Sequence, residues 1–148
     1  MLSFIEEVDV TAVNLAVELE RAVIQHWLDD DESIYVNEDT WHRYVLRIQN
    51  EIGVIRFSTF VTFKSTVSFL QQLQFANDLN STEHDLFTAH VGDDACLTID
   101  YALIFRDGLV RESFIRICRQ FPFNIERALK SVDPDGIFIL RPGEAEDV

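Results

Sequence analysis

The chain has 148 residues, of which 47% are hydrophobic, so it is long and apolar enough to bury a core as one domain, which excludes a disordered protein. Its 26 acidic and 12 basic residues give a net charge of −14, which argues against nucleic acid or an anionic membrane as a partner. This charge either serves solubility alone or suits the binding of basic or unfolded protein segments.

The N-terminal stretch "MLSFIEEVDV" has no basic residue and no sustained apolar run, so it does not have the pattern of a signal peptide. No other stretch approaches the roughly 20 apolar residues that cross a bilayer. We therefore expect a soluble cytoplasmic protein. Cys96 and Cys118 are far apart in apolar segments, which predicts small buried hydrophobes and no disulfide framework.

The first predicted helix covers residues 9–28, with Asp9 or Thr11 as its N-cap. Its apolar residues form two adjacent stripes, the first with Val10, Val13, Val17, Ile24 and Leu28, the second with Leu15, Leu19, Val23 and Trp27. This apolar face is wider than a surface helix needs. Either a partner subunit or the rest of the same chain covers the excess.

Strands are expected after this helix. Residues 34–36 predict a short edge strand, and alternating residues in 42–49 and 54–63 predict a hairpin that turns near Gly53. Phe60 is an apolar residue on the face of this hairpin that is otherwise polar.

A second helix is predicted over residues 66–79, with Ser65 as its N-cap and an apolar stripe of Phe69, Leu70, Leu73 and Ala76. Continuing this stripe leads to Asn77 and Asn80. Asparagine tolerates left-handed backbone angles and satisfies unpaired backbone groups at helix ends. We therefore expect Asn77 and Asn80 to have a structural role at the end of the helix, and no catalytic one.

A second hairpin is predicted from residues 86–91 and 95–105, followed by a turn at Asp107-Gly108. Apolar residues keep helical phase across Pro122, so one kinked helix is expected over 110–132. A short strand is expected at 137–140. The order α-β-β-β-α-β-β-α predicts an α+β fold, with three helices and an antiparallel sheet of about five strands, in one domain over 1–140 with a flexible acidic tail at 141–148.

No motif in the sequence indicates a reaction. His26, His42, His84 and His90 lack metal-ligand spacing, "DDDES" and "DPDG" do not fit a calcium loop, and the chain has no GxSxG or glycine-rich phosphate loop. We therefore predict no catalytic residue, no metal and no cofactor.

The stretches "FANDLNS" and "LTIDYALIFRDGLVRESFIRICRQF" resemble the YbjN family, which is labelled as bacterial sensory transduction regulators. Asn77, Asn80 and Gly108 match the asparagine pair and the glycine of that family, and the resemblance covers roughly residues 33–132. It implies a fold similar to type III secretion chaperones, which are small, acidic and dimeric and bind extended segments of client proteins. It also implies a function carried by apolar surfaces and sheet edges.

The leading hypothesis is a non-enzymatic, cytoplasmic, protein-binding module that is chaperone-like or regulatory and acts as a homodimer on a protein partner or client segment. Trp27 and Phe60 are the predicted partner-binding residues, unless both pack beneath a helix. The alternative is a small-ligand sensor with a phenylalanine-lined pocket that modulates a partner protein.

Overall fold

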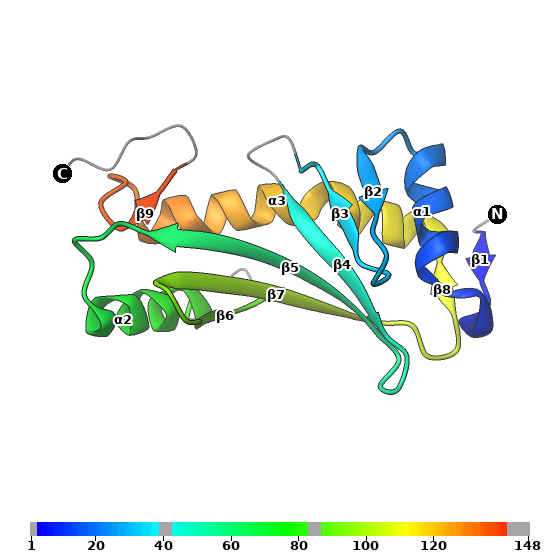
Figure 1. Cartoon of the computed structure of the whole chain (residues 1–148), viewed down its shortest axis with the longest axis horizontal. Helices are drawn as coiled ribbons and strands as arrows, with labels where there is room; N and C mark the ends of the chain where they lie inside the picture. Colours follow the sequence, from blue (N-terminus) through cyan, green and yellow to red (C-terminus); the bar gives the residue numbers. More distant parts are fainter. Residues whose placement is uncertain (1–2, 39–42, 83–86, 142–148) are drawn as a thin grey trace. The chain divides into compact units, whose positions relative to one another are not determined.

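The computed structural model describes residues 3–38, 43–82 and 87–141 (Figure 1). Its elements in chain order are β1 (Phe4–Ile5), η1 (Glu7–Asp9), α1 (Ala12–Arg21), β2 (His26–Leu28), β3 (Ile34–Val36), β4 (Tyr44–Gln49), β5 (Val54–Phe63), α2 (Phe69–Asn80), β6 (Thr88–Val91), β7 (Cys96–Ile104), β8 (Leu109–Val110), α3 (Arg111–Val132) and β9 (Ile139–Leu140). Three α-helices and antiparallel strand pairs confirm the α+β class.

Within the described residues, the larger sheet has seven strands in the order β2-β3-β4-β5-β7-β6, with β9 paired to β5, while β1 and β8 form a separate pair. The chain divides into two compact units, one with residues 1–58 and 102–123, the other with 59–101 and 124–148. The strands β5 and β7 and the helix α3 are each divided between the two units.

The core of the first unit is aromatic. Tyr44 and Phe57 of the sheet meet Phe114 and Phe121 of α3, with ring centroids between 5.1 and 6.4 Å apart. All four side chains are buried, and rings of this size supply much of the apolar area that a small unit must bury.

Pro122 lies inside α3, so the prediction of one continuous helix is confirmed. Because proline has no N–H, it leaves the carbonyl of Cys118, one turn earlier, without its helical donor. The Tyr44 hydroxyl donates to this carbonyl over 2.6 Å from the adjacent sheet. Burial raises the pKa of Tyr44, so the hydroxyl keeps the proton that it donates.

The first helix is shorter than predicted. α1 is capped by Thr11, as one of the two alternatives proposed, but it ends at Arg21, and Trp27 and Leu28 lie in β2. The helix ends because Val23 adopts a φ of 58°, which places the amide of Ile24 on the Leu19 carbonyl and that of Val23 on the Glu20 carbonyl. This arrangement is a Schellman motif, which usually has glycine at the position of Val23.

The strand β3 is not at the edge of the sheet, contrary to the prediction. It pairs with β4 on one side and with β2 on the other, where Trp27 lies opposite Tyr35. The error has the same origin as the overlong helix, because β2 lies within the segment that was predicted to be helical.

The second unit has its own aromatic core, in which Phe63 and Phe138 each lie against Phe75 of α2, with centroids 5.5 and 5.7 Å away. The carboxylate of Asp133, which is buried, accepts hydrogen bonds from the amides of Ile137, Phe138 and Ile139. These bonds hold the turn that leads into β9, the short strand predicted at 137–140.

The predicted start of α2 is wrong. The helix begins at Phe69 with Ser68, and not Ser65, as its N-cap, and the Ser68 hydroxyl and the Gln71 side chain form a reciprocal capping box. The predicted apolar stripe is confirmed for Ala76, which is buried, and wrong for Phe69, Leu70 and Leu73, which are exposed. The buried side chains of α2 are those of Gln72, Phe75, Ala76 and Leu79.

The remaining elements follow the predicted ranges closely. β5 has the predicted bounds, and β6, β7 and α3 differ from them by one or two residues at their ends within the described part of the chain. The strand β8 and the strand β1 that pairs with it were not predicted. His42, His84, Leu86 and residues 142–148, which include nearly all of the predicted tail, lie outside the described residues.

Candidate partner-binding surfaces

One side of α2 presents uncovered apolar side chains. Phe69 is 65% exposed, Leu70 75% and Leu73 44%, and helical spacing places the three on the same side of the helix. We call these three residues the α2 face. No charged residue occurs in the sequence between Lys64 and Asp78, so the first two turns of α2, which carry the α2 face, have no charged side chain.

The sequence analysis placed the α2 face in the core because α2 has two apolar stripes. Phe75 and Leu79 form one stripe, with the polar Gln72 in the same row, and the α2 face forms the other. The stripe with Phe75 and Leu79 is the buried one, and the Gln72 amide within it donates to the Val67 carbonyl over 3.3 Å. The pair Phe75 and Leu79, one turn apart, was the signal that would have found the buried side.

Trp27 lies on β2 and is 44% exposed, so it is not fully buried beneath a helix. Its ring stacks on Tyr35 with a centroid distance of 4.5 Å and an interplanar angle of 12°, and its indole N–H donates to the carboxylate of Glu38. Both contacts fix the ring while one of its faces stays accessible. A rigid aromatic of this kind is typical of protein interfaces.

Phe60 lies on β5 and is 51% exposed. Thr62, two residues along the same strand and therefore on the same side, is exposed as well. Trp27 belongs to the first unit and Phe60 to the second.

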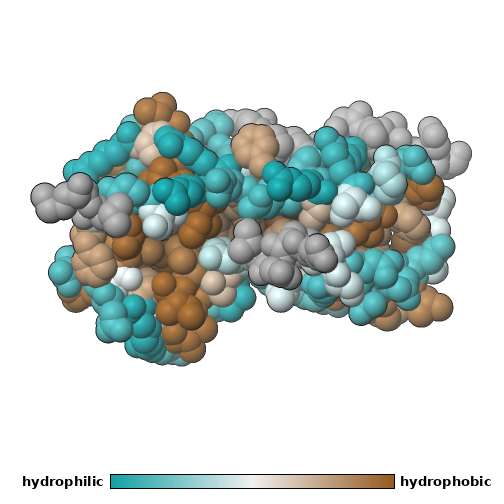
Figure 2. All heavy atoms as spheres, turned by 180° about the vertical axis from the view of Figure 1, so that it is seen from behind, coloured by the Kyte–Doolittle hydropathy of each residue, from teal (hydrophilic) through white to brown (hydrophobic). Residues whose placement is uncertain are grey.

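The wide apolar face of α1 is covered only in part. Leu15 and Leu19 are fully buried within the first unit, whereas Val13 and Val17 are 62% and 43% exposed. Hydrophobic side chains also lie among hydrophilic ones on the molecular surface in Figure 2. The rest of the chain therefore covers part of this face, and its covering by a partner subunit stays a prediction.

Asn80 is the last residue of α2, and its side chain occupies the outer edge of β6. Its Nδ2 donates to the Ala89 carbonyl over 2.8 Å, and its Oδ1 accepts from the Ala89 amide over 2.7 Å. The carboxamide thus takes the place of a peptide group in a further strand. At Asn77 the backbone carbonyl is the group involved, since it accepts from the amide and the hydroxyl of Ser81.

Gly108 precedes β8 and not α3 directly. Its φ of +104° is unfavourable for other residues, and a Cβ at this position would collide with the ring of Phe4 and lie 2.8 Å from the Ile5 carbonyl oxygen. Glycine is therefore required where the strand β1 passes over this turn.

The described part of the chain offers no evident reactive group. No three His, Cys, Asp or Glu side chains converge there as a metal site would require. Burial raises the pKa of the Cys118 thiol to about 12, and burial also raises that of Cys96, so neither is an activated thiolate. None of the described helices combines the length and the apolar character that a membrane span requires.

No protein-family model and no curated protein matches the chain. Among solved structures, the crystal structure of YbjN from E. coli, described as a candidate transcription regulator, is similar to it with a TM-score of 0.72. The match covers 88% of this chain and 95% of that chain at 14% sequence identity. The chain therefore has a YbjN-like fold, in agreement with the resemblance in its sequence, and at this identity the likeness concerns the fold alone.

Proposed function

We propose that the protein is a non-enzymatic regulatory module of the cytoplasm that binds other proteins and acts as a homodimer. The observation that carries the proposal is the α2 face, with Phe69, Leu70 and Leu73 uncovered on a helix whose one charged residue, Asp78, lies near its C-terminal end. Burying such side chains is favourable by about 25 cal/mol for each Å² of apolar surface removed from water.

A second copy of the chain is the occupant that we assign to the α2 face. A net charge of −14 makes two copies repel each other over most of their surface. The uncharged run around the α2 face is a place where two helices can meet around a two-fold axis without bringing acidic side chains together. The dimer leaves other apolar surfaces for partners.

Trp27 and Phe60 are the side chains that we assign to the partner or client segment. Both are large, aromatic and about half exposed, and Trp27 is held in place by Tyr35 and Glu38. The net charge of −14 favours a segment with basic residues. Regulation by this protein would then proceed through protein contacts, because its charge opposes direct binding to DNA.

Partner capture tests the assignment of Trp27 and Phe60. Tagged wild-type protein, Phe60→Glu, Trp27→Glu and the control Thr62→Glu are used to capture proteins from lysate, with quantitative mass spectrometry and circular dichroism to verify folding. Thr62 shares the strand and the side of Phe60, so its variant adds the same charge without removing an aromatic ring. We expect specific partners with wild type and Thr62→Glu that are lost with Phe60→Glu or Trp27→Glu. The same retained proteins in all four would contradict the assignment.

The alternative function, a small-ligand sensor, is supported by a pocket whose lining differs from the expected phenylalanines. The pocket beside α1 contains one phenylalanine, Phe4, and is otherwise lined mainly by charged and polar side chains. This pocket is therefore not lined by phenylalanines, and its charged groups suit a polar ligand.

A further inference from the structure

A pocket of about 270 Å³ lies within the first unit, between the N-terminal segment, α1 and the start of α3. Its walls combine apolar, acidic and basic side chains, namely those of Phe4, Ile5, Glu6, Asp9, Asn14, Val17, Glu18, Arg21 and Arg111. The volume is large enough for a molecule of several non-hydrogen atoms, and it exceeds the space that single waters need.

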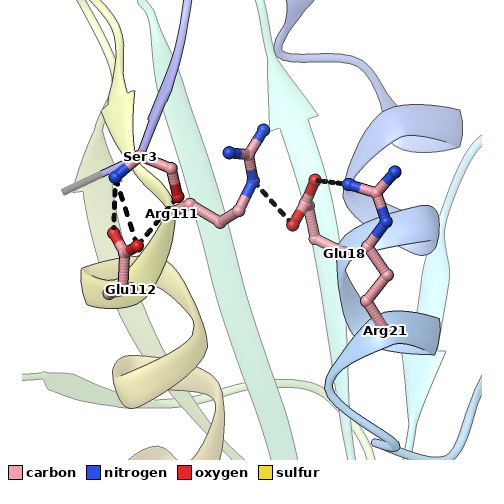
Figure 3. A network of polar contacts seen from close by, with 5 residues as sticks. All are labelled: Ser3, Glu18, Arg21, Arg111 and Glu112. Atoms are coloured by element: carbon pink, nitrogen blue, oxygen red, sulfur yellow. Dashed lines mark hydrogen bonds and ion pairs between the residues drawn. The ribbon is translucent and has the colours of Figure 1, made fainter. Parts of the chain in front are cut away.

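A buried carboxylate between two guanidinium groups forms the charged part of this pocket. Glu18 is 6% exposed, its Oε2 lies 2.7 Å from Arg111 Nε, and its Oε1 lies 3.3 Å from Arg21 Nη1 (Figure 3). Two positive groups therefore face one buried negative group. The carboxylate of Glu112, the next residue after Arg111, accepts hydrogen bonds from the amide and the hydroxyl of Ser3.

Arg111 has donors that this ion pair does not use. Its Nε is buried and close to Glu18, but it makes no hydrogen bond in the part of the chain that is described, so its N–H is not directed at the carboxylate. Its two terminal nitrogens point away from Glu18 in Figure 3. A guanidinium with unused donors beside a pocket is suited to bind a second carboxylate through paired hydrogen bonds.

Acidic side chains line the same pocket. Glu6 and Asp9 are exposed residues at its wall, and in total three carboxylates and two guanidinium groups line it. A simple anion would be repelled by these acids, and a simple cation would leave the arginine donors unused. A ligand that carries both charges pairs with both kinds of group.

We propose that this pocket binds a free α-amino acid with a small or medium apolar side chain. The α-carboxylate binds the Arg111 and Arg21 guanidinium groups, the α-ammonium binds Asp9 and Glu6, and the side chain lies against Phe4 and Val17. The proposal does not depend on the dimer or on the partner surfaces.

Calorimetric titration of the full chain with L-leucine, 4-methylpentanoate and isoamylamine tests the proposal, because the second lacks the ammonium group of leucine and the third lacks its carboxylate. L-alanine and L-valine extend the series to smaller side chains. We expect saturable binding of at least one of these amino acids, and binding about tenfold weaker or worse for 4-methylpentanoate and isoamylamine, since each loses one ion pair. No saturable binding of the three amino acids at millimolar concentration, or equal binding of 4-methylpentanoate, overturns the proposal.

Substitutions of pocket residues test whether the amino acid binds in this pocket. Asp9→Asn removes the ammonium partner and leaves the buried ion pair intact, and Arg111→Gln removes the carboxylate partner. Arg116→Gln is the control, since Arg116 is exposed on α3 and does not line the pocket. We expect binding at least about tenfold weaker for Asp9→Asn and for Arg111→Gln, and unchanged for the control. Should Arg111→Gln fail to fold, Asp9→Asn decides alone, and wild-type affinity in that variant overturns the proposal.

Discussion

Val23 is a residue whose own conformation decides where an element ends. A β-branched side chain at a φ of 58° is strained, because the left-handed region brings Cβ close to the following carbonyl oxygen. The sequence gives no cue for such an end, since the position usually holds glycine or asparagine. This one residue accounts for both the overlong first helix and the missing strand β2.

Replacing Val23 with glycine should stabilise the protein. The Val23 side chain is 91% exposed, so its removal loses little packing, while the strain of about 1–2 kcal/mol at a left-handed residue is relieved and partly offset by the entropy of glycine. We expect urea denaturation to give a free energy of unfolding about 0.5–1 kcal/mol higher for Val23→Gly. The control Ala22→Gly, at an ordinary φ of −83°, should lower it. A loss of stability in Val23→Gly would contradict the assignment of the strain.

The sequence predicts that Asn80 lies at a helix end, but it does not predict the residue to which the Asn80 side chain hydrogen-bonds. The two hydrogen bonds to Ala89 depend on β6 lying beside α2, which no local pattern encodes. They also protect the edge of β6 from pairing with another chain.

Removing the Asn80 side chain should leave the Ala89 amide and carbonyl without their partner. We expect Asn80→Ala to lower the free energy of unfolding by about 1–3 kcal/mol and to speed hydrogen exchange at the Ala89 amide. Asn77→Ala, one turn earlier and exposed, should change stability by no more than about 0.5 kcal/mol. Equal effects of the two substitutions would show that the Asn80 carboxamide does not hold the edge of β6.

At the scale of elements, strong periodicity is what the sequence predicts best. Alternation gave β5 its bounds, and helical phase carried α3 through Pro122. The α2 face was assigned to the core because periodicity alone does not distinguish between two apolar stripes on one helix. The choice depends on Phe63 and Phe138, which meet α2 at Phe75 from distant parts of the chain.

The continuity of α3 has a testable cause. Tyr44→Phe should leave the buried Cys118 carbonyl without a donor and lower the free energy of unfolding by about 1–3 kcal/mol. Pro122→Ala restores a helical N–H for the same carbonyl, so Tyr44→Phe should have a smaller effect in that background. A double-mutant cycle with chemical denaturation measures this coupling. Additive effects would mean that Pro122 and Tyr44 do not share the Cys118 carbonyl.

At the scale of the whole molecule, composition predicts a kind of partner but not the place where that partner would bind. The net charge of −14 and the absence of reaction motifs predict a protein-binding surface, but exposure depends on how the chain folds. Trp27 and Phe60 were chosen from the sequence as outward aromatics, and both have about half of their surface exposed. The α2 face became visible only in the structure.

Light scattering after size-exclusion chromatography, over a range of concentrations, shows whether the α2 face joins two copies of the chain. Wild type is compared with Leu70→Glu and Leu73→Glu, and with Gln71→Glu, which adds the same charge on a side of α2 that helical geometry turns away from the α2 face. We expect twice the chain mass for wild type and Gln71→Glu, and the mass of one chain for Leu70→Glu and Leu73→Glu. A wild-type protein with the mass of one chain at every concentration, or dimers that persist in Leu70→Glu and Leu73→Glu, would contradict dimerisation through the α2 face.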